Sequence, residues 1–162
     1  MKLIKLPERL KVIAGFIADG AAVVDVGSDH GLLPTYLALK GTCRRLIASD
    51  ISAGSLSAAR SNAKIYGVSN EIEFMVADGL SSISIGTVDT IVISGLGGET
   101  IRDILLGSPW AMGPGINLIL QPQSKIDVLC NFLYNSSCQI GKTQVVVDRG
   151  RQYTVIICSG GE

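Results

Sequence analysis

Apolar residues occur along the chain in two alternating patterns. Short continuous runs are typical of buried strands, and positions three or four residues apart are typical of helices. The continuous runs predict strands at residues 21–26, 44–50, 71–78, 88–98 and 115–123. The helical spacings predict helices before, between and after them, at about residues 7–18, 31–40, 53–66, 99–106 and 124–135. Strands and helices therefore alternate along most of the sequence.

The ends of the predicted helices carry residues that favour helix termini. Pro7 suits a first helical turn, and Ser52 is a good N-cap because its side chain can accept a backbone N–H. Gly41 and Gly67 follow the second and third helices, where glycine favours the left-handed conformation that ends many helices. Residues 79–87 show neither apolar pattern and are expected to form a loop with at most one helical turn.

The last part of the chain has a different pattern. Strands are predicted at residues 143–148 and 152–158, and the residues RGR between them leave no room for a helix, so the pair forms an antiparallel hairpin. The alternating segments predict a parallel sheet covered by helices on both faces. A mostly parallel sheet closed by a C-terminal antiparallel hairpin is similar to the class I methyltransferase fold. We therefore expect an α/β, three-layer, Rossmann-like protein.

Composition narrows the class of protein. The chain has 162 residues, 47% hydrophobic and 17% charged, which is typical of a single compact domain. We therefore expect residues 1–162 to form one domain. The formal net charge is zero. Binding to a nucleic acid would thus depend on a local basic patch or on another segment.

The sequence shows neither a targeting segment nor a metal motif. Charged side chains interrupt the N-terminal segment, which predicts neither a secretory signal nor a membrane span, so we expect a cytoplasmic protein. The four cysteines form no CxxC pair and the chain has a single histidine, so no metal site is expected. The cysteines are expected to be reduced and structural.

Acidic residues and glycine turns follow the predicted strands at their carboxyl ends, where open α/β sheets bind ligands. They form four groups along the chain: Asp25, Gly27, Ser28, Asp29, His30 and Gly31; Asp50 and Ile51; Asp78 and Gly79; Ser94 and Gly95. Any one of these acids alone is explained equally well as a turn cap. A regular series at successive strands favours a ligand that spans several of them.

The spacing of these residues favours an adenosine cofactor without phosphates. Asp50 lies roughly 20 residues after the first glycine turn, where an acid accepts the hydroxyls of a ribose. A dinucleotide needs G-x-G-x-x-G, and Asp29 would repel its pyrophosphate, which disfavours an NAD-dependent oxidoreductase. S-adenosyl-L-methionine instead has cationic amino and sulfonium groups, which Asp25 and Asp29 suit. We expect His30 to have a structural or binding role.

Residues after the fourth and fifth strands are expected to form the wall beside the transferring methyl group. Gly95 and Gln121 are the candidates for positioning the acceptor, and neither is a proton carrier. The candidates for contact with the substrate are Gly97, Gly98, Pro122 and Gln123. The glycines are also consistent with a simple strand-to-helix turn, and Pro122 with the end of a strand.

Three stretches, DVGSDHGLLP, GLGGETIRDIL and LILQPQ, resemble in order and spacing the TrmK-type bacterial tRNA (adenine-N1)-methyltransferases, which methylate adenine 22 of tRNA with S-adenosyl-L-methionine. The resemblance covers nearly the whole chain. It implies that the first stretch is the cofactor turn, that Asp50 binds the ribose, and that Asp78 and Gly79 lie at the adenine. It also implies that residues 95–98 and 121–123 border the acceptor pocket.

In two respects the sequence differs from that family. Its members continue beyond the last strand into a helical, coiled-coil-like C-terminal domain, whereas this sequence ends at Glu162, and they tend to have Asn where this chain has Gln123. The tRNA partner is implied by the resemblance alone. Arg149 and Arg151 in the predicted hairpin turn are the first candidates for RNA contact, and paired surface charge explains each equally well.

The predicted reaction is methyl transfer to N1 of an adenine in tRNA. Neutral adenine N1 already has an in-plane lone pair, so catalysis would rest on in-line positioning and on acceptors for the developing positive charge. Two alternatives stay open at this point: a small-molecule methyltransferase of the same fold, and a cofactor-binding relative without activity on its own. The sequence does not indicate the oligomeric state.

Overall fold

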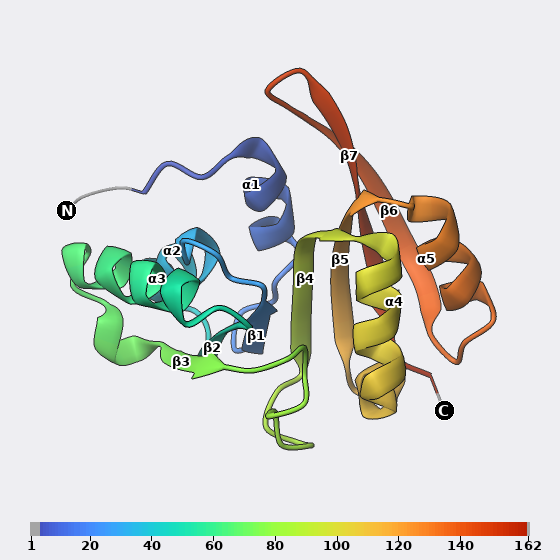
Figure 1. Cartoon of the computed structure of the whole chain (residues 1–162), viewed down its shortest axis with the longest axis horizontal. Coiled ribbons are helices and arrows are strands. Elements are labelled where there is room, and N and C mark those ends of the chain that lie inside the picture. Colours follow the sequence, from blue (N-terminus) through green and yellow to red (C-terminus); the bar gives the residue numbers. More distant parts are fainter. Residues whose placement is uncertain (1–3, 162) are drawn as a thin grey trace.

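The computed structural model describes residues 4–161 and contains a seven-stranded sheet with the order β3-β2-β1-β4-β5-β7-β6 (Figure 1). The parallel strands are β1 (Ala22–Val26), β2 (Arg45–Asp50), β3 (Glu73–Val76), β4 (Thr90–Gly97) and β5 (Asn117–Ser124). The antiparallel hairpin consists of β6 (Gln139–Asp148) and β7 (Arg151–Ser159), and β7 also pairs with β5. The predicted α/β, Rossmann-like fold class with a closing hairpin is confirmed.

Helices cover both faces of the sheet (Figure 1). The helices on one face are α1 (Glu8–Gly15), α2 (Leu32–Lys40) and α3 (Ala53–Ile65), and those on the other are α4 (Gly98–Gly107) and α5 (Ile126–Tyr134). Successive strand residues belong to two different cores: Val23 packs on the side of α1, and Val24 packs on the side of α4. Strands buried on both faces form continuous apolar runs, which is the pattern the sequence shows.

The caps of α2 and α3 are as expected, whereas Pro7 directly precedes α1 and is not in its first turn. The side chain of Ser52 accepts a hydrogen bond from the backbone N–H of Ser55 at 3.2 Å, which begins α3. Gly41 adopts the left-handed conformation at the end of α2, with φ of 71°. These local signals were correctly interpreted because they act within one helical turn.

Other element boundaries differ from the sequence prediction. Helix α1 ends at Gly15, earlier than expected, and β6 begins at Gln139, before the predicted start. Short 3-10 turns also occur at Ser69–Glu71 and Pro109–Met112. The start of β6 was missed because this edge strand is exposed along most of its length, so it lacks a strong apolar pattern.

The strand order fixes where a ligand can bind. Because β1 lies between β2 and β4, the chain leaves β1 toward one side of the sheet and later returns on the other. This topological switch point opens a crevice at the carboxyl ends of the strands. Strand β6 runs in the same direction as β5, so the hairpin turn after β6 lies at the carboxyl ends of the parallel strands. The hairpin projects beyond these strand ends in Figure 1.

Candidate functional site

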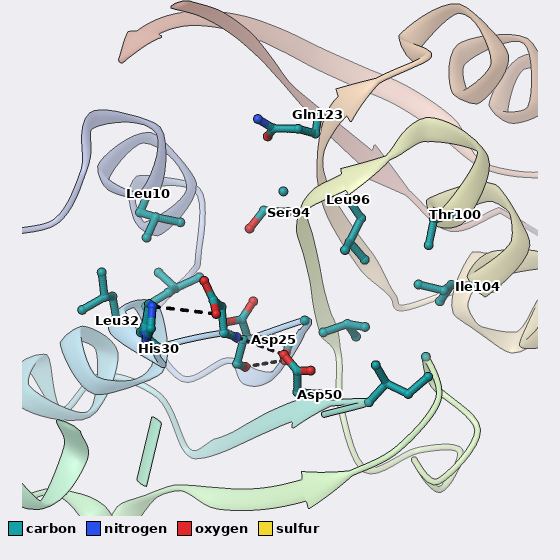
Figure 2. Close-up of a pocket in the computed structure, with 18 of the residues that line it drawn as sticks. Leu10, Asp25, His30, Leu32, Asp50, Ser94, Leu96, Thr100, Ile104 and Gln123 are labelled. Atoms are coloured by element: carbon teal, nitrogen blue, oxygen red, sulfur yellow. Dashed lines mark hydrogen bonds and ion pairs between the residues drawn. The ribbon is translucent and has the colours of Figure 1, made fainter. Parts of the chain in front are cut away.

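A cavity of ≈ 620 Å³ lies at the carboxyl ends of β1, β2 and β4 (Figure 2). Strand β1 and the turn after it contribute Asp25 and His30, the end of β2 contributes Asp50, and β4 contributes Ser94. Figure 2 shows α1 and α2 on one side of the cavity and α4 on the opposite side. The cavity therefore occupies the switch point of the sheet, where ligands bind in open α/β folds.

The turn after β1 is held against α3. Asp29 and Gly31 both have positive φ, at 53° and 69°, and aspartate tolerates this conformation better than most residues. Glycine is required at position 31 for a second reason, because a Cβ there would lie 2.7 Å from the Cβ of Ala59 on α3. The side-chain amide of Asn62 donates to the carbonyl of His30 at 2.8 Å. Helix α3 thus fixes the turn from behind.

The carboxylate of Asp50 is oriented by two backbone groups. The N–H of Asp29 donates to Oδ2 at 3.1 Å, and the N–H of Ser52 donates to Oδ1 at 2.9 Å. Each carboxylate oxygen can accept more than one hydrogen bond, so both oxygens of Asp50 can still bind a ligand that enters the cavity. A carboxylate fixed in this position is suited to accept the two hydroxyls of a ribose.

Asp25 lines the same cavity but is almost fully buried, with 5% of its surface exposed. Burial raises the pKa of this carboxyl to about 7, Ser28 and Arg9 act in the opposite direction, and the charge of Asp50 adds to the increase. Asp25 therefore changes its charge near neutral pH, which is common for groups in functional sites.

The rim of the cavity is more exposed than its interior. The side chains of Asp29 and His30 are 73% and 66% exposed, with 4.0 Å between Oδ1 and Nε2, so this contact contributes little to stability. Ile51 is 71% exposed and presents an apolar side chain beside Asp50. On the opposite rim, Gly79 lies under Ile104 of α4, which a Cβ on that glycine would approach to 3.2 Å.

The turn after β4 is shaped by a buried side chain. The N–H of Gly95 donates to Oε1 of Gln121 at 3.1 Å, and Nε2 of Gln121 donates to the carbonyl of Pro122 at 3.1 Å. Gln121 is fully buried, so it supports the turn from behind. Ser94 and Gly95 line the cavity directly, and Figure 2 shows Gln123 at the same wall.

Several predicted site residues do not line the cavity: Gly31, Gly97, Gly98, Gln121, Pro122, Arg149 and Arg151. A Cβ at Gly98 would collide with the carbonyl of Lys125, so this glycine lets α4 approach the turn after β5. Arg149 and Arg151 lie in the hairpin, at the edge of the sheet that carries the cavity. The other predicted residues all line the cavity.

Helices supply lining residues that the sequence analysis missed. Arg9 and Leu10 come from α1, and Thr100 and Ile104 come from α4; Figure 2 shows Leu10, Thr100 and Ile104. Helix α1 precedes the first strand in sequence and reaches the cavity only through the tertiary fold. The strand-end pattern could not identify these residues because it covers only the few positions directly after each strand.

Neither a membrane-spanning helix nor a metal cluster is found among residues 4–161. No helix there has both the length and the apolar character needed to cross a membrane. No group of three or more His, Cys, Asp or Glu side chains in this range could hold a metal ion. The four cysteines are free thiols, and burial raises the pKa of Cys158 to about 12, which keeps it protonated at neutral pH.

Sequence comparison identifies the family. Residues 6–156 match the family model described as methyltransferase domain. The tRNA (adenine(22)-N(1))-methyltransferase of Bacillus subtilis (strain 168) is 31% identical over 162 residues, which are 100% of this chain and 68% of that protein. The chain belongs to this methyltransferase family. The resemblance inferred from three short stretches of sequence is confirmed.

Solved structures of similar proteins match the methyltransferase over nearly its whole length. A Streptococcus pneumoniae protein in complex with S-adenosyl-L-methionine has a TM-score of 0.87 and 31% identity, covering 95% of this chain and 72% of that chain. M. capricolum TrmK in complex with S-adenosyl-homocysteine has a TM-score of 0.85 and 25% identity, covering 97% of this chain and 70% of that chain.

Proposed function

We propose that the protein is an S-adenosyl-L-methionine-dependent methyltransferase that modifies N1 of adenine 22 in tRNA. The B. subtilis relative carries that activity in its name, and the S. pneumoniae and M. capricolum relatives bind the cofactor and its product. The observation that carries the proposal is the cavity at the switch point, where two backbone N–H groups orient Asp50. Since the proposed substrate is tRNA, we place the enzyme in the cytoplasm.

The acidic side chains that line the cavity fit S-adenosyl-L-methionine. Three further acids, Asp25, Asp29 and Asp78, line the cavity with Asp50. Such a set attracts a ligand with cationic groups and repels one with phosphates. We call these acids and the turns that hold them the cofactor half of the cavity.

Within the cofactor half we assign the ribose hydroxyls to Asp50. The cationic amino acid part lies between Asp25 and Asp29, and the backbone around it is shaped by Gly27, Ser28, His30 and Gly31. The adenine ring lies beside Ile51, whose exposed apolar side chain offers a packing surface, and against the turn of Asp78 and Gly79.

The opposite wall, which we call the acceptor half, consists of Ser94, Gly95 and Gln123 with Gln121 behind them. When bound, the cofactor supplies an electrophilic methyl group on a sulfonium sulfur. The acceptor half places N1 of the target adenine in line with it, and polar oxygens of this wall stabilise the positive charge that develops on the base. N1 would attack the methyl carbon with its lone pair while the bond from that carbon to sulfur breaks, leaving S-adenosyl-homocysteine, so no residue needs to remove a proton.

The hairpin is the proposed RNA contact outside the cavity. Arg149 and Arg151 project from the same edge of the sheet as the cavity, where they can neutralise phosphates on either side of an extruded base. Gly97 and Pro122 lie where the ends of β4 and β5 pair, and Gly98 begins α4, so we propose that they shape the acceptor wall without lining the cavity. We further propose that residues 1–162 act as one domain, because residues 6–156 match a single family model; residues 1–3 and 162 lie outside the described residues.

Calorimetric titration with S-adenosyl-homocysteine, followed by labelled methyl transfer to unmodified tRNA, tests this function. We expect binding, and transfer to wild-type tRNA but not to tRNA with guanine at position 22. Binding accompanied by transfer to both tRNAs would refute the assigned position. Absence of binding would refute the cofactor assignment itself.

A further inference from the structure

Helix α1 places a charged side chain beside the acceptor half of the cavity. Arg9 lines the cavity, and 28% of its side chain is exposed. Its Nη1 donates to Oε1 of Gln121 on β5 at 3.5 Å, and its Nε lies 3.9 Å from Oδ2 of Asp148 on β6. It also lines the same cavity as Asp25 on β1, and its charge lowers the pKa of that carboxyl. One guanidinium therefore acts on polar groups from three strands.

The contact with Gln121 supports the orientation of its amide. Oε1 accepts from the N–H of Gly95 at 3.1 Å and also from Arg9. If the amide rotated by half a turn, its NH₂ group would face both of these donors, and Oε1 would face the carbonyl of Pro122. Because Gln121 is fully buried, water cannot relieve such mismatched contacts. A second donor on Oε1 strengthens the orientation that binds Gly95.

The contact with Asp148 joins the same guanidinium to the hairpin. Asp148 is the last residue of β6, directly before the hairpin turn that carries Arg149. The planar guanidinium donates to Gln121 with one nitrogen and lies at ion-pair distance from Asp148 with another, whereas a lysine ammonium provides a single point charge. Arg9 thus connects the hairpin and the wall of the cavity through one rigid group.

The neighbouring Lys11 shows what an ordinary surface pair on this helix looks like. Its partner, Glu8, is on the same helix three residues away, the distance is 2.9 Å, and the two side chains are 52% and 59% exposed. The partner of Arg9 in the hydrogen bond is 112 residues away and buried. Arg9 is therefore held in the tertiary structure in a way that Lys11 is not.

We propose that Arg9 is a positioning residue, which acts on methyl transfer by holding the Gln121 amide and hence the Gly95 turn, and which supplies the countercharge for Asp25. The first part of this inference, the effect on methyl transfer, rests on the proposed function. The second part, the countercharge for Asp25, is tested by binding of S-adenosyl-homocysteine without tRNA. The charged groups around this centre are Arg9 from α1, Asp25 from β1, Asp50 from β2 and Asp148 from β6, and the titratable side chains of Asp29, His30 and Asp78 line the same cavity.

The experiment compares Arg9→Met, which retains the aliphatic volume, with Arg9→Lys and with Lys11→Met as the matched control. For Arg9→Met we expect kcat for tRNA methylation to fall about 10-fold, since small displacements of positioning groups have large kinetic effects. Arg9→Lys should recover part of this loss, and Lys11→Met should match wild type. Combining Arg9→Met with Gln121→Met should add little to the effect of Gln121→Met alone.

A second readout does not require tRNA. We call the pH at which affinity for S-adenosyl-homocysteine is half lost the midpoint. It should be higher in Arg9→Met than in wild type, because Asp25 loses its countercharge. Arg9→Lys should keep the wild-type midpoint. Wild-type kcat together with a wild-type midpoint in Arg9→Met would overturn the proposal. If Arg9→Met fails to fold, Arg9→Lys tests the proposal instead. A reduced kcat with an unchanged midpoint in Arg9→Lys supports the proposal, and an unchanged kcat refutes it.

If wild type binds S-adenosyl-homocysteine but does not methylate tRNA, the proposed function fails and the midpoint still tests Arg9. A raised midpoint in Arg9→Met then supports its role at Asp25. An unchanged midpoint overturns that role.

Discussion

The two halves of the cavity are held together in different ways. In the cofactor half, Asp50 is oriented by the N–H of Ser52, two residues away, and by that of Asp29 in the adjacent turn. In the acceptor half, the N–H of Gly95 depends on the side chain of Gln121, which in turn contacts Arg9 in the first helix. Backbone N–H groups orient the acid of the first half, whereas a buried side chain and its side-chain partner orient the turn of the second.

This difference has a consequence for function. An acid oriented by backbone N–H groups does not depend on which side chains those donor residues carry, which suits the binding of an invariant cofactor. A site fixed by buried side chains can be altered by single substitutions far along the sequence, which suits the adjustment of a wall to a particular acceptor. We therefore expect substitutions in the two halves to affect different measured quantities.

The largest effect is expected in the cofactor half. Asp50→Ala should weaken binding of S-adenosyl-homocysteine by about 100-fold, because the hydrogen bonds of a charged acceptor to the ribose are lost. Calorimetric titration measures this change directly. Asp127→Ala, an exposed acid in the first turn of α5, is the control and should bind as wild type does. Equal affinities of Asp50→Ala and wild type would disprove the ribose assignment.

A substitution in the turn of the cofactor half should also reduce the stability of the fold. Gly31→Ala should reduce the free energy of unfolding by about 2 kcal/mol, because the new Cβ meets Ala59 and φ is positive. The matched control is Gly41→Ala, which has a similar φ of 71° but nothing within 4 Å of the added Cβ. Urea unfolding of both variants separates packing from backbone strain. If both lose the same stability, close packing by α3 is not what requires glycine at position 31.

In the acceptor half, Gln121→Met should reduce kcat for methyl transfer by about 20-fold, since the N–H of Gly95 loses its acceptor and the turn is free to move. Binding of S-adenosyl-homocysteine should change by less than about threefold, because the residue does not line the cavity. Single-turnover kinetics and calorimetry measure the two quantities. A loss of cofactor affinity as large as the loss of kcat would contradict the separation of the two halves.

Affinity for S-adenosyl-homocysteine should depend on pH through Asp25. The pKa of this carboxyl is raised to about 7, so it is ionised above that pH and protonated below it. A cationic amino group binds better to the ionised form, so affinity should fall about tenfold from about pH 8 to about pH 6. Asp25→Asn should remove this dependence. A wild-type affinity that stays constant over this range would show that Asp25 does not contact the amino group.

The raised pKa of Asp25 has the opposite effect on folding stability without ligand. Its folded pKa lies above the unfolded value of 3.8. Its stabilising contribution is thus fully present below about pH 3.8 and is lost as pH rises from there through about 7. Asp25→Asn should therefore gain stability relative to wild type at about pH 8. Denaturant unfolding at several pH values measures this difference.

The smallest effect is expected at the hairpin. Replacing Arg149 and Arg151 together by serine should raise KM for tRNA about fivefold and reduce its salt dependence, because two phosphate contacts are lost. The affinity for S-adenosyl-homocysteine should not change. Replacement of Lys64 near the end of α3, away from the hairpin, serves as the control. An unchanged KM and salt dependence would remove the hairpin from the proposed RNA surface.

Much of the cofactor half could be predicted from the sequence. Asp25, Asp50 and Asp78 each follow an apolar run, and parallel strands bring their carboxyl ends to one edge of the sheet. The acceptor half could be predicted from the sequence only in part. Gln121 was expected at the wall, but its burial behind Gly95 depends on the pairing of β4 with β5, in which Ser94 lies opposite Gln121.

The sequence by itself therefore determined the order of strands and helices, the caps of α2 and α3, and the acids at the strand ends. These features depend on residues close together in the chain, where apolar periodicity and turn chemistry act directly. The tertiary structure alone decided that α1 closes one side of the cavity and that Arg9 reaches Gln121, 112 residues away. Such contacts arise from packing a helix onto a sheet, and no local pattern encodes them.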